Sequence, residues 1–308
     1  MTTEKSFDIL VAGEINPDLI LSGDVVPEFG QVEKLVDSAA LTIGSSSAIF
    51  ACGAARLGLK VAFVGVCGED VFGRFMLVEM GKRDVDVNNV ILRKDGQTGL
   101  SVILSSGSDR AILTHPGLIA ALQAADIPDA LLRQSRHLHV ASYFLQTNLQ
   151  PGLPGLFQRA RELGLTTSLD TNYDPSEKWV GFDELLSLTN VFLPNEKEAL
   201  SLSGETNLDL AADRLGSRVD ALAVKLGAAG ALGVRGGQKV RAASVPVNVI
   251  DTVGAGDSFN AGFLYGYLHN WELERALQLA CTCGAISTQK AGGTEGQPTL
   301  GEAMKYVS

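Results

Sequence analysis

The chain has 308 residues, enough for one large α/β domain or two smaller ones with a sizeable core. Its formal net charge of −10 argues against binding to nucleic acid, which needs a basic face, and no apolar run is long enough to span a membrane. Residues 1–6 lack the layout of a secretory signal, so we expect a cytoplasmic protein.

The chain has four cysteines, and their positions suit neither a disulfide framework nor a zinc site. Cys281 and Cys283 would point to different sides of a helix. We expect these two, together with Cys52 and Cys67, to be buried and reduced.

The first predicted element is a strand at residues 7–12, a continuous apolar run of the kind that is buried on both faces of a parallel sheet. Asn16 and Asp18 follow this strand. Such side chains commonly bond their own backbone in a turn. They also stand beyond the carboxyl end of a strand, where open α/β sheets bind ligands. Both interpretations stay open on the residues alone.

Two predicted hairpins interrupt the series of strands and helices. One covers residues 19–41 around a turn at 27–30, and the other pairs 98–105 with 110–114 around a turn at 106–109. Two such hairpins could pair into a small sheet of their own, or they could extend the edge of the main sheet.

Between the hairpins, residues 44–58 predict a helix that serines cap and Gly58 ends. A strand at 60–65 follows it. The glycines near the end of this strand lack the G-x-G-x-x-G spacing of a dinucleotide-binding turn, so we do not interpret them as one.

His137 and His139 lie on one face of a predicted strand. A metal site would need a third ligand, and none is evident, so we interpret the pair as hydrogen-bonded polar residues. A helix at 151–164 and a strand at 165–170 come next.

Asn195 follows a predicted strand at 191–194, and Glu198 stands three residues later, at the position of a capping box. A further strand at 221–225 ends at Lys225, which on the residues alone is a solvated strand end. The chain contains no Walker A sequence, G-x-x-x-x-G-K-[ST], and this excludes a P-loop kinase.

The sequence Asp-Thr-Val-Gly-Ala-Gly-Asp-Ser-Phe-Asn at residues 251–260 predicts a tight turn that opens a helix at about Ala255. The first amides of this helix would have no intrahelical acceptor, and together with the helix dipole they form an anion site. Asp257 places an acid inside that site. It is either a helix cap or a base beside a phosphate that is being transferred, and the neighbouring Asp251 and glycines favour the base.

Residues 251–257 resemble the C-terminal signature of the ribokinase, or PfkB, carbohydrate kinases, and the resemblance runs in order from Asn16 to Gly293. It implies a single kinase domain over residues 1–308. This would be a three-layer, Rossmann-like α/β fold with a small β-sheet lid from segments at approximately 16–41 and 97–115. It also implies phosphoryl transfer from ATP to a sugar hydroxyl with Mg²⁺, and a homodimer contact through the lid.

The resemblance also implies roles for individual residues. The catalytic residues implied are Gly254, Ala255, Gly256 and Asp257. The amides at 255–257 would meet the transferring phosphoryl group, and Asp257 would deprotonate the acceptor hydroxyl. The residues implied at the sugar are Asn16, Asp18, Gly44, Ser45, Ser142 and Asn172. Those implied at the nucleotide are Lys225, Gly227, Gly230 and Thr252.

Two cation sites follow from the same resemblance. Asn195 and Glu198 would order Mg²⁺ through its waters, which suits an ion that keeps several waters and needs few protein ligands. Asp251 would lie beside a monovalent cation such as K⁺, together with carbonyl groups from 292–294.

The chain departs from the family pattern at three positions. Ser45 replaces a second glycine, Ile49 stands where an asparagine is expected, and Asp174 replaces an arginine. The first two weaken the case for ribose as the substrate. The third weakens the case for a sugar acid, whose carboxylate an arginine would bind through two hydrogen bonds.

We expect the acceptor to be an uncharged sugar or a sugar-like alcohol. The segments implied at the sugar, 16–18, 44–49 and 142–143, contain no lysine or arginine to meet a phosphate. The groups expected to bind hydroxyls are acceptors on Asp18 and Asn16 and donors on Ser45 and Asn172.

Two alternatives remain. A nucleoside kinase of the same fold would need an aromatic or apolar slot for the base, and the predicted lid offers Phe29 and Tyr143 at most. The other alternative is a nucleotide- or sugar-binding protein without turnover, and the intact Asp257 and Glu198 argue against it.

Overall fold

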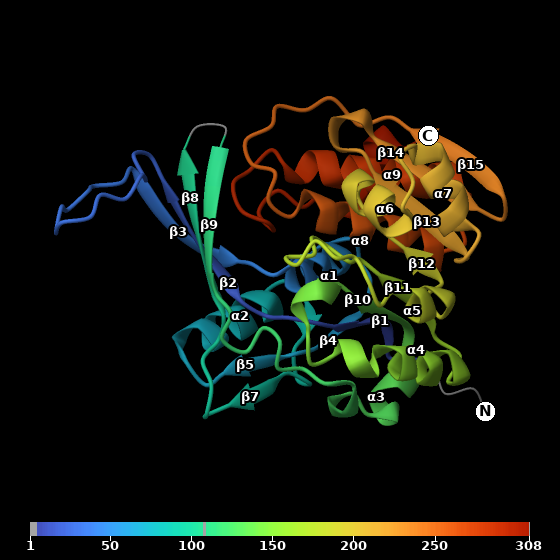
Figure 1. Cartoon of the computed structure of the whole chain (residues 1–308), viewed down its shortest axis with the longest axis horizontal. Helices are drawn as coiled ribbons and strands as arrows, with labels where there is room; N and C mark the ends of the chain where they lie inside the picture. Colours follow the sequence, from blue (N-terminus) through green and yellow to red (C-terminus); the bar gives the residue numbers. More distant parts are fainter. Residues whose placement is uncertain (1–4, 107–108, 308) are drawn as a thin grey trace.

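The computed structural model describes residues 5–106 and 109–307, and Figure 1 shows its arrangement. Its main sheet has the strand order β15-β14-β13-β12-β11-β10-β1-β4-β6. Neighbours from β13 to β6 are parallel, and β14 and β15 run antiparallel at one edge. The strands are β1 Phe7–Ala12, β4 Val61–Val64, β6 Val85–Asp86, β10 Ser135–Val140, β11 Thr166–Leu169, β12 Val191–Phe192, β13 Ala221–Lys225, β14 Ala231–Arg235 and β15 Gln238–Ala242.

Strand β1 shows why the main sheet is buried on both faces. Ile9 and Val11 pack into the core on one face, whereas Leu10 and Ala12 pack into the core on the other. The first core is covered by α1 Ser46–Arg56, α2 Val71–Gly81, α8 Ala255–Leu268, α9 Leu273–Ser287 and α10 Leu300–Ala303. The second core is covered by α3 Asp129–Arg133, α4 Leu153–Glu162, α5 Asp183–Ser187, α6 Glu196–Ser203 and α7 Leu208–Gly216. The predicted three-layer α/β fold is therefore confirmed.

A small sheet stands beside the main one and has the strand order β3-β2-β8-β9 (Figure 1). Its strands are β2 Pro17–Ser22, β3 Ser38–Ile43, β8 Leu100–Ser106 and β9 Asp109–His115. Two antiparallel hairpins join through a parallel β2–β8 pairing. The separate sheet is confirmed and the edge extension of the main sheet is wrong. A further pair is β5 Val66–Gly68 with β7 Ile91–Arg93.

Residues 23–37 connect β2 to β3 and extend away from the body of the molecule (Figure 1). Phe29 in this connection is 97% exposed. Lys34 forms ion pairs with Asp24 at 2.9 Å and Glu28 at 3.1 Å, so its charge is satisfied within the same segment. The second hairpin's predicted turn includes residues 107 and 108, which lie outside the described residues, as do residues 1–4.

The predicted starts of two helices agree with the structure. The Ser45 side chain caps α1 by accepting a hydrogen bond from the Ala48 amide, and α8 begins at Ala255. All four cysteines are free and buried, as expected. In the part of the chain that the structure describes, no helix is both long and apolar enough to cross a membrane.

Candidate active site

The candidate site lies along the edge of the main sheet where β1, β10, β11, β12 and β13 end. These strands are parallel neighbours, so the residues that follow them meet in space although they are far apart in the sequence. Helix α8 reaches the same edge, because Asn260 Oδ1 lies 3.4 Å from the ammonium group of Lys225 at the end of β13.

The turn before α8 has the geometry that its glycines predict. Gly254 is the N-cap residue with φ of 71°, and a Cβ there would lie 2.8 Å from the carbonyl oxygen of Gly293. The Ala255 amide donates to the Thr252 carbonyl at 3.3 Å. The amides of Gly254, Gly256 and Asp257 have no acceptor among the described residues. Of the three amides predicted at the anion site, those of residues 255–257, two are therefore free.

Asp257 lies in the first turn of α8 and is only 8% exposed. Burial raises the pKa of its carboxyl well above the usual value, and the charge of Asp170 raises it further. The charge of Lys225 and a hydrogen bond from Ser46 act in the opposite direction. The carboxyl is a proton acceptor at the start of a helix, placed where the sequence predicted a base.

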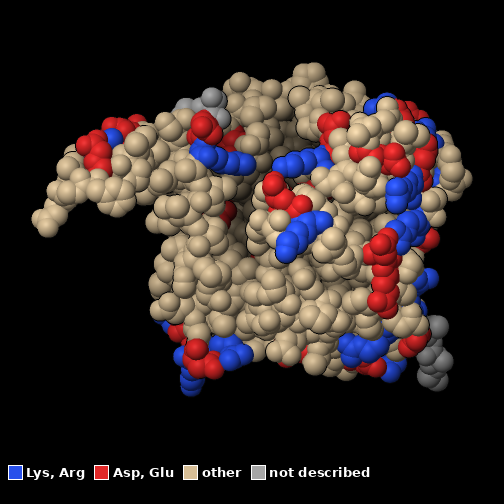
Figure 2. Space-filling model, in the orientation of Figure 1, with Lys and Arg blue, Asp and Glu red and all other residues tan. Residues whose placement is uncertain are grey.

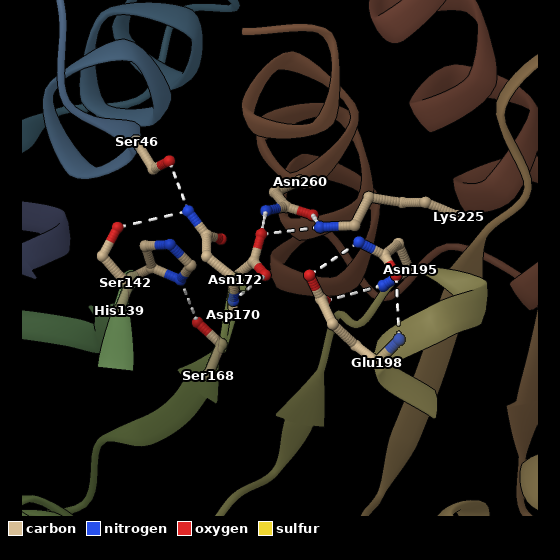
Figure 3. A network of polar contacts seen from close by, with 10 residues as sticks. All are labelled: Ser46, His139, Ser142, Ser168, Asp170, Asn172, Asn195, Glu198, Lys225 and Asn260. Carbon is tan, nitrogen blue, oxygen red and sulfur yellow. Dashed lines mark hydrogen bonds and ion pairs between the residues drawn. The ribbon is translucent and has the colours of Figure 1, made fainter. Parts of the chain in front are cut away.

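Lys225 is held inside the site by Asp170 (Figure 3). Its ammonium group lies 2.6 Å from Asp170 Oδ2, and Asn260 Nδ2 donates to the same oxygen. Burial alone would lower the pKa of Lys225, but the charges of Asp170 and Glu198 outweigh it and raise the pKa. The interpretation of Lys225 as a solvated strand end is wrong, because a strand-end lysine is drawn inward wherever a buried carboxylate faces it.

Asn195 and Glu198 form the predicted capping box at the start of α6. The Asn195 side chain accepts from the Glu198 amide at 2.9 Å, and Glu198 Oε2 accepts from the Asn195 amide at 2.9 Å. Asn195 Nδ2 also donates to Glu198 Oε1 at 2.6 Å (Figure 3). Burial and the charge of Asp170 raise the pKa of Glu198 to about 7.

The charge balance at this edge of the sheet suits a bound divalent cation. The charge of Asp170 raises the pKa of both Glu198 and Asp257, and Lys225 forms an ion pair with Asp170. No group of three or more His, Cys, Asp or Glu side chains in the described chain could hold a metal ion alone. Mg²⁺ bound to ATP phosphates needs no such group, because waters and phosphate oxygens complete its shell.

Asp18 and Gly44 face each other between the small sheet and α1. A Cβ on Gly44 would lie 2.2 Å from Asp18 Oδ1, so only glycine leaves room for this carboxylate. Burial raises the pKa of Asp18 to about 7, with the charge of Arg110 acting against this and that of Asp251 adding to it. Asn16 is also buried, and its amide makes one long contact, 3.4 Å, with the Pro17 carbonyl.

The donors expected from Ser45 and Asn172 are already engaged. Ser45 Oγ donates to the Glu14 carbonyl at 2.6 Å. Asn172 Nδ2 donates to Ser46 Oγ at 2.5 Å and to Ser142 Oγ at 3.2 Å (Figure 3). In this structure both residues therefore donate to protein groups, and their donation to a sugar stays a prediction. What Asn172 leaves free, among the described residues, is its carbonyl oxygen.

Arg110 on β9 brings a positive charge to the acceptor side. Its guanidinium group lies 3.8 Å from Asp251 Oδ1 and is close enough to Asp18 to oppose the rise in that residue's pKa. Arg110 lies in the second hairpin, outside the segments 16–18, 44–49 and 142–143 that contain no lysine or arginine. Figure 2 shows the hollow that separates the small sheet from the body of the molecule.

Asp251 is held by the two backbone segments that the resemblance placed around a monovalent cation. Its Oδ1 accepts from the Val253 amide at 3.0 Å, and its Oδ2 accepts from the Gly292 amide at 2.9 Å. The 292–294 loop and the start of α8 are therefore joined through this carboxylate.

The residues predicted at the nucleotide line one cavity of about 550 Å³. Its walls include Lys225, Gly227, Gly230, Thr252, Ala255 and Gly256, together with Ser244, Val245, Pro246, Val247 and Val249 and residues of α9. Gly230 has φ of 91°, and a Cβ there would lie 2.0 Å from the Ala242 carbonyl, so the turn requires glycine. A mostly apolar cavity of this size matches a site for a cofactor-sized ligand.

His137 and His139 are buried and bonded to neighbouring hydroxyls, as interpreted from the sequence. His137 contacts Thr166 Oγ1 at 2.7 Å and Ser168 Oγ at 2.6 Å, and His139 Nδ1 contacts Ser168 Oγ at 2.7 Å. Burial lowers the pKa of His137 to about 3. The pair is neutral and structural.

The sequence matches the pfkB family of carbohydrate kinases over residues 7–300. The chain belongs to this family. It is therefore a sugar kinase, a phosphotransferase whose acceptor is an alcohol group, and the resemblance found in the sequence is confirmed.

This chain matches three relatives over nearly the whole length of each relative, and the three carry different names. The kinase is 32% identical over 250 residues to an uncharacterized sugar kinase of Archaeoglobus fulgidus, covering 80% of this chain and 98% of the relative. It is 28% identical to a ribokinase of Haemophilus influenzae over 97% of this chain and 98% of the relative. It is 29% identical to an ATP-dependent ribose-1-phosphate kinase of Halopiger xanaduensis, with the same shares.

Among solved structures, the kinase resembles a putative ribokinase II from E. coli in complex with ATP and Mg²⁺. The TM-score is 0.86 at 22% identity, over 97% of this chain and 98% of the other. This likeness concerns the fold.

The sequence assigned no role to four residues that the structure places in the site: Glu14, Ser46, Asp170 and Asn260. Two of them could have been found from the sequence. Asp170 ends a predicted strand at the ligand-binding edge, and Asn260 stands three residues after Asp257, on the same side of the helix. Glu14 and Ser46 join the site through contacts between distant segments.

Proposed function

We propose that this kinase transfers the γ-phosphoryl group of ATP to a hydroxyl of a small, uncharged sugar, with Mg²⁺. The observation that carries the proposal is the position of Asp257. Its buried carboxyl lies beside two free amides, with the apolar cavity on the Gly256 side and the acceptor residues around Ser46 on the other. A base next to an anion site is the arrangement that phosphoryl transfer to an alcohol needs.

In this mechanism Asp257 takes the proton of the acceptor hydroxyl as the hydroxyl oxygen bonds to the γ-phosphorus of ATP. The bond from that phosphorus to the β-phosphate oxygen breaks, and ADP leaves. The amides of Gly256 and Asp257 face the negative charge on the transferring group, and α8 adds its dipole. When bound, Mg²⁺ neutralises charge on the phosphate oxygens, and Asn195 and Glu198 would hold it through water. Lys225 stays paired with Asp170 at the wall of the nucleotide cavity.

The preference for an uncharged acceptor is supported by the oxygen-rich acceptor side. Asp18 and the free carbonyl oxygen of Asn172 accept hydrogen bonds, which suits hydroxyl groups and opposes a phosphate. A nucleoside is less suited, because Tyr143 is buried against Phe144 and Phe182, and Phe29 lies in the exposed 23–37 connection.

Arg110 favours a second candidate, a phosphorylated sugar. Its guanidinium group stands at the acceptor side, and one relative is named a ribose-1-phosphate kinase. An arginine binds phosphate through paired hydrogen bonds, so a movement of β9 toward the site would supply the missing cation.

Further parts of the proposal concern the whole chain. We propose a single kinase domain in which the small sheet is a lid over the acceptor, and a homodimer formed through the exposed strand β9. We also propose that Asp251 and the 292–294 loop bind K⁺. The free, buried cysteines are typical of the reducing cytoplasm.

A coupled assay of ADP release tests these points. The acceptors are neutral pentoses and hexoses, their monophosphates, a sugar acid and nucleosides, each with and without Mg²⁺ and with K⁺ or choline as the monovalent cation. The highest kcat/KM is expected for a neutral sugar in the presence of Mg²⁺. A higher kcat/KM for a monophosphate would favour the second candidate, and no ADP release with any acceptor would overturn the proposed function.

A further inference from the structure

Glu14 is a buried carboxylate at the end of β1, 3% exposed, for which the mechanism above has no role. Its Oε1 accepts from the Ser47 amide at 3.2 Å and from Ser142 Oγ at 2.8 Å, and its Oε2 accepts from Ser47 Oγ at 2.5 Å. Within the described residues, no lysine or arginine pairs with it. Neutral donors from two elements therefore hold this carboxylate.

The contact with Ser142 sets the direction of a chain of hydrogen bonds. A carboxylate only accepts hydrogen bonds, so Ser142 donates its one hydroxyl hydrogen to Glu14. Ser142 Oγ can then only accept from its other neighbour, which is Asn172 Nδ2 at 3.2 Å. The amide of Asn172 is thereby fixed with its nitrogen toward Ser142 and its oxygen away from it.

The same direction continues to the base. The second hydrogen of Asn172 Nδ2 goes to Ser46 Oγ at 2.5 Å (Figure 3). Because Ser46 accepts there, its own proton is free for the carboxyl of Asp257, whose pKa Ser46 lowers. The chain runs from Asp257 through Ser46, Asn172 and Ser142 to Glu14, and it joins α8, α1, β11, β10 and β1.

We propose that Glu14 is a positioning residue that fixes this chain. It orients Asn172 so that its Oδ1 accepts from a hydroxyl of the acceptor, and it leaves the Ser46 proton for Asp257. The proposal rests on the proposed function and deepens it, because it requires an acceptor with a hydroxyl donor facing Asn172. Without an acceptor at position 14, Ser142 could donate to Asn172, the amide could turn, and Ser46 could donate to the turned amide instead of to Asp257.

Two uncharged variants separate the hydrogen bond from the charge of Glu14. In Glu14→Gln, the Ser47 amide keeps the Gln oxygen at the Oε1 position, so the acceptor for Ser142 remains. Glu14→Met has a similar size and no such acceptor. Ser47→Ala is a matched control, because it removes the contact at Oε2 and leaves the chain intact. Ser142→Ala interrupts the chain without changing Glu14, which keeps the test valid if the methionine variant does not fold.

The comparison uses the sugar that the wild type phosphorylates best. We expect kcat/KM for this sugar to be about tenfold lower in Glu14→Met than in Glu14→Gln, the upper end of the usual effect of a lost hydrogen bond between neutral groups. KM for ATP should be equal in the two. The Ser142→Ala variant should resemble Glu14→Met, and Ser47→Ala should resemble the wild type in kinetics while melting at a lower temperature.

The pH dependence of kcat gives a readout that a structural role would not move. The groups that affect the pKa of Asp257 are Asp170, Lys225, Glu14 and Ser46. Both variants lack the charge of Glu14 and keep Asp170 and Lys225. They differ in the orientation of Ser46. Losing the Ser46 hydrogen bond disfavours the ionised base, so the acid limb should lie at higher pH in Glu14→Met than in Glu14→Gln.

Equal sugar kinetics and equal acid limbs in the two Glu14 variants would overturn the inference while leaving the proposed function in place. A parallel rise of KM for ATP and for the sugar would also overturn it, because that pattern indicates general distortion. A wild type without activity on any acceptor would overturn both proposals.

Discussion

The candidate site has an acceptor half and a nucleotide half, which differ in the kinds of residues that form them. The acceptor half consists of buried polar side chains that bond one another, with Asn172 donating to both Ser46 and Ser142. The nucleotide half is an apolar cavity whose turns depend on glycines, and Gly230 tolerates no Cβ. Asp257 and the free amides lie where the halves meet.

This difference indicates how each half binds its ligand. Side chains that are fixed by their own hydrogen bonds discriminate strongly, because a mismatched ligand leaves buried polar groups unpaired. Apolar walls discriminate weakly, since one methyl group more or less changes the binding free energy little. We therefore expect substitutions in the acceptor half to change specificity, and substitutions of the apolar side chains that line the nucleotide half to be tolerated.

The largest effect is expected where the halves meet. Asp257→Asn should lower kcat by roughly 10²–10⁴-fold, the usual cost of removing a general base. Affinity for ATP, measured by calorimetry, should stay close to that of the wild type, because the nucleotide cavity does not depend on this carboxylate. A variant with near-normal kcat would show that Asp257 is a helix cap only.

In the acceptor half, Asp18→Ala should lower kcat/KM for the sugar by about 10–100-fold, which corresponds to ~1.5–3 kcal/mol for a hydrogen bond to a charged group. KM for ATP should not change. Steady-state kinetics with either substrate varied would measure both values. If KM for ATP rose equally, the two halves would not be separable.

Glu198→Gln is expected to raise the Mg²⁺ concentration needed for half-maximal activity by about tenfold, the lower end of what is typical for residues that orient a metal's ligands. The Gln side chain can still accept a hydrogen bond from the Asn195 amide, so the capping box is retained. Mg²⁺ titrations and thermal melts would be compared. A large fall in Tm with an unchanged Mg²⁺ requirement would assign Glu198 to the capping box alone.

The smallest effect is expected in the nucleotide half. Val247→Ala removes two methyl groups from the cavity wall, and we expect KM for ATP to rise roughly threefold, since Val247 is only partly buried. Sugar kinetics should be unchanged. A loss as large as that of Asp18→Ala would contradict the proposed difference between the halves.

The fold could be predicted largely from the sequence because its signals are local. The apolar run of β1 predicts a buried strand without reference to a neighbouring strand. The glycines before α8 likewise predict a tight turn. The capping box of Asn195 and Glu198 is likewise contained within four residues.

The contacts within the site could not be predicted, because they depend on register between distant strands. Nothing near Lys225 in the sequence indicates Asp170, which lies 55 residues away. Nor could the sequence show that Ser45 and Asn172 donate their hydrogen bonds to protein groups. The place of Arg110 beside Asp251 depends on the pairing of its hairpin with β2, which the sequence does not show.

The span of the hydrogen-bond chain has a consequence for synthesis on the ribosome. Glu14 and Asp257 lie in distant segments of the polypeptide, and α8 packs against α1 in the same core. Until α8 has left the exit tunnel, a nascent chain has the acceptor side chains but neither Asp257 nor the free amides. The proposed mechanism therefore implies that the growing polypeptide cannot consume ATP until α8 has folded onto α1.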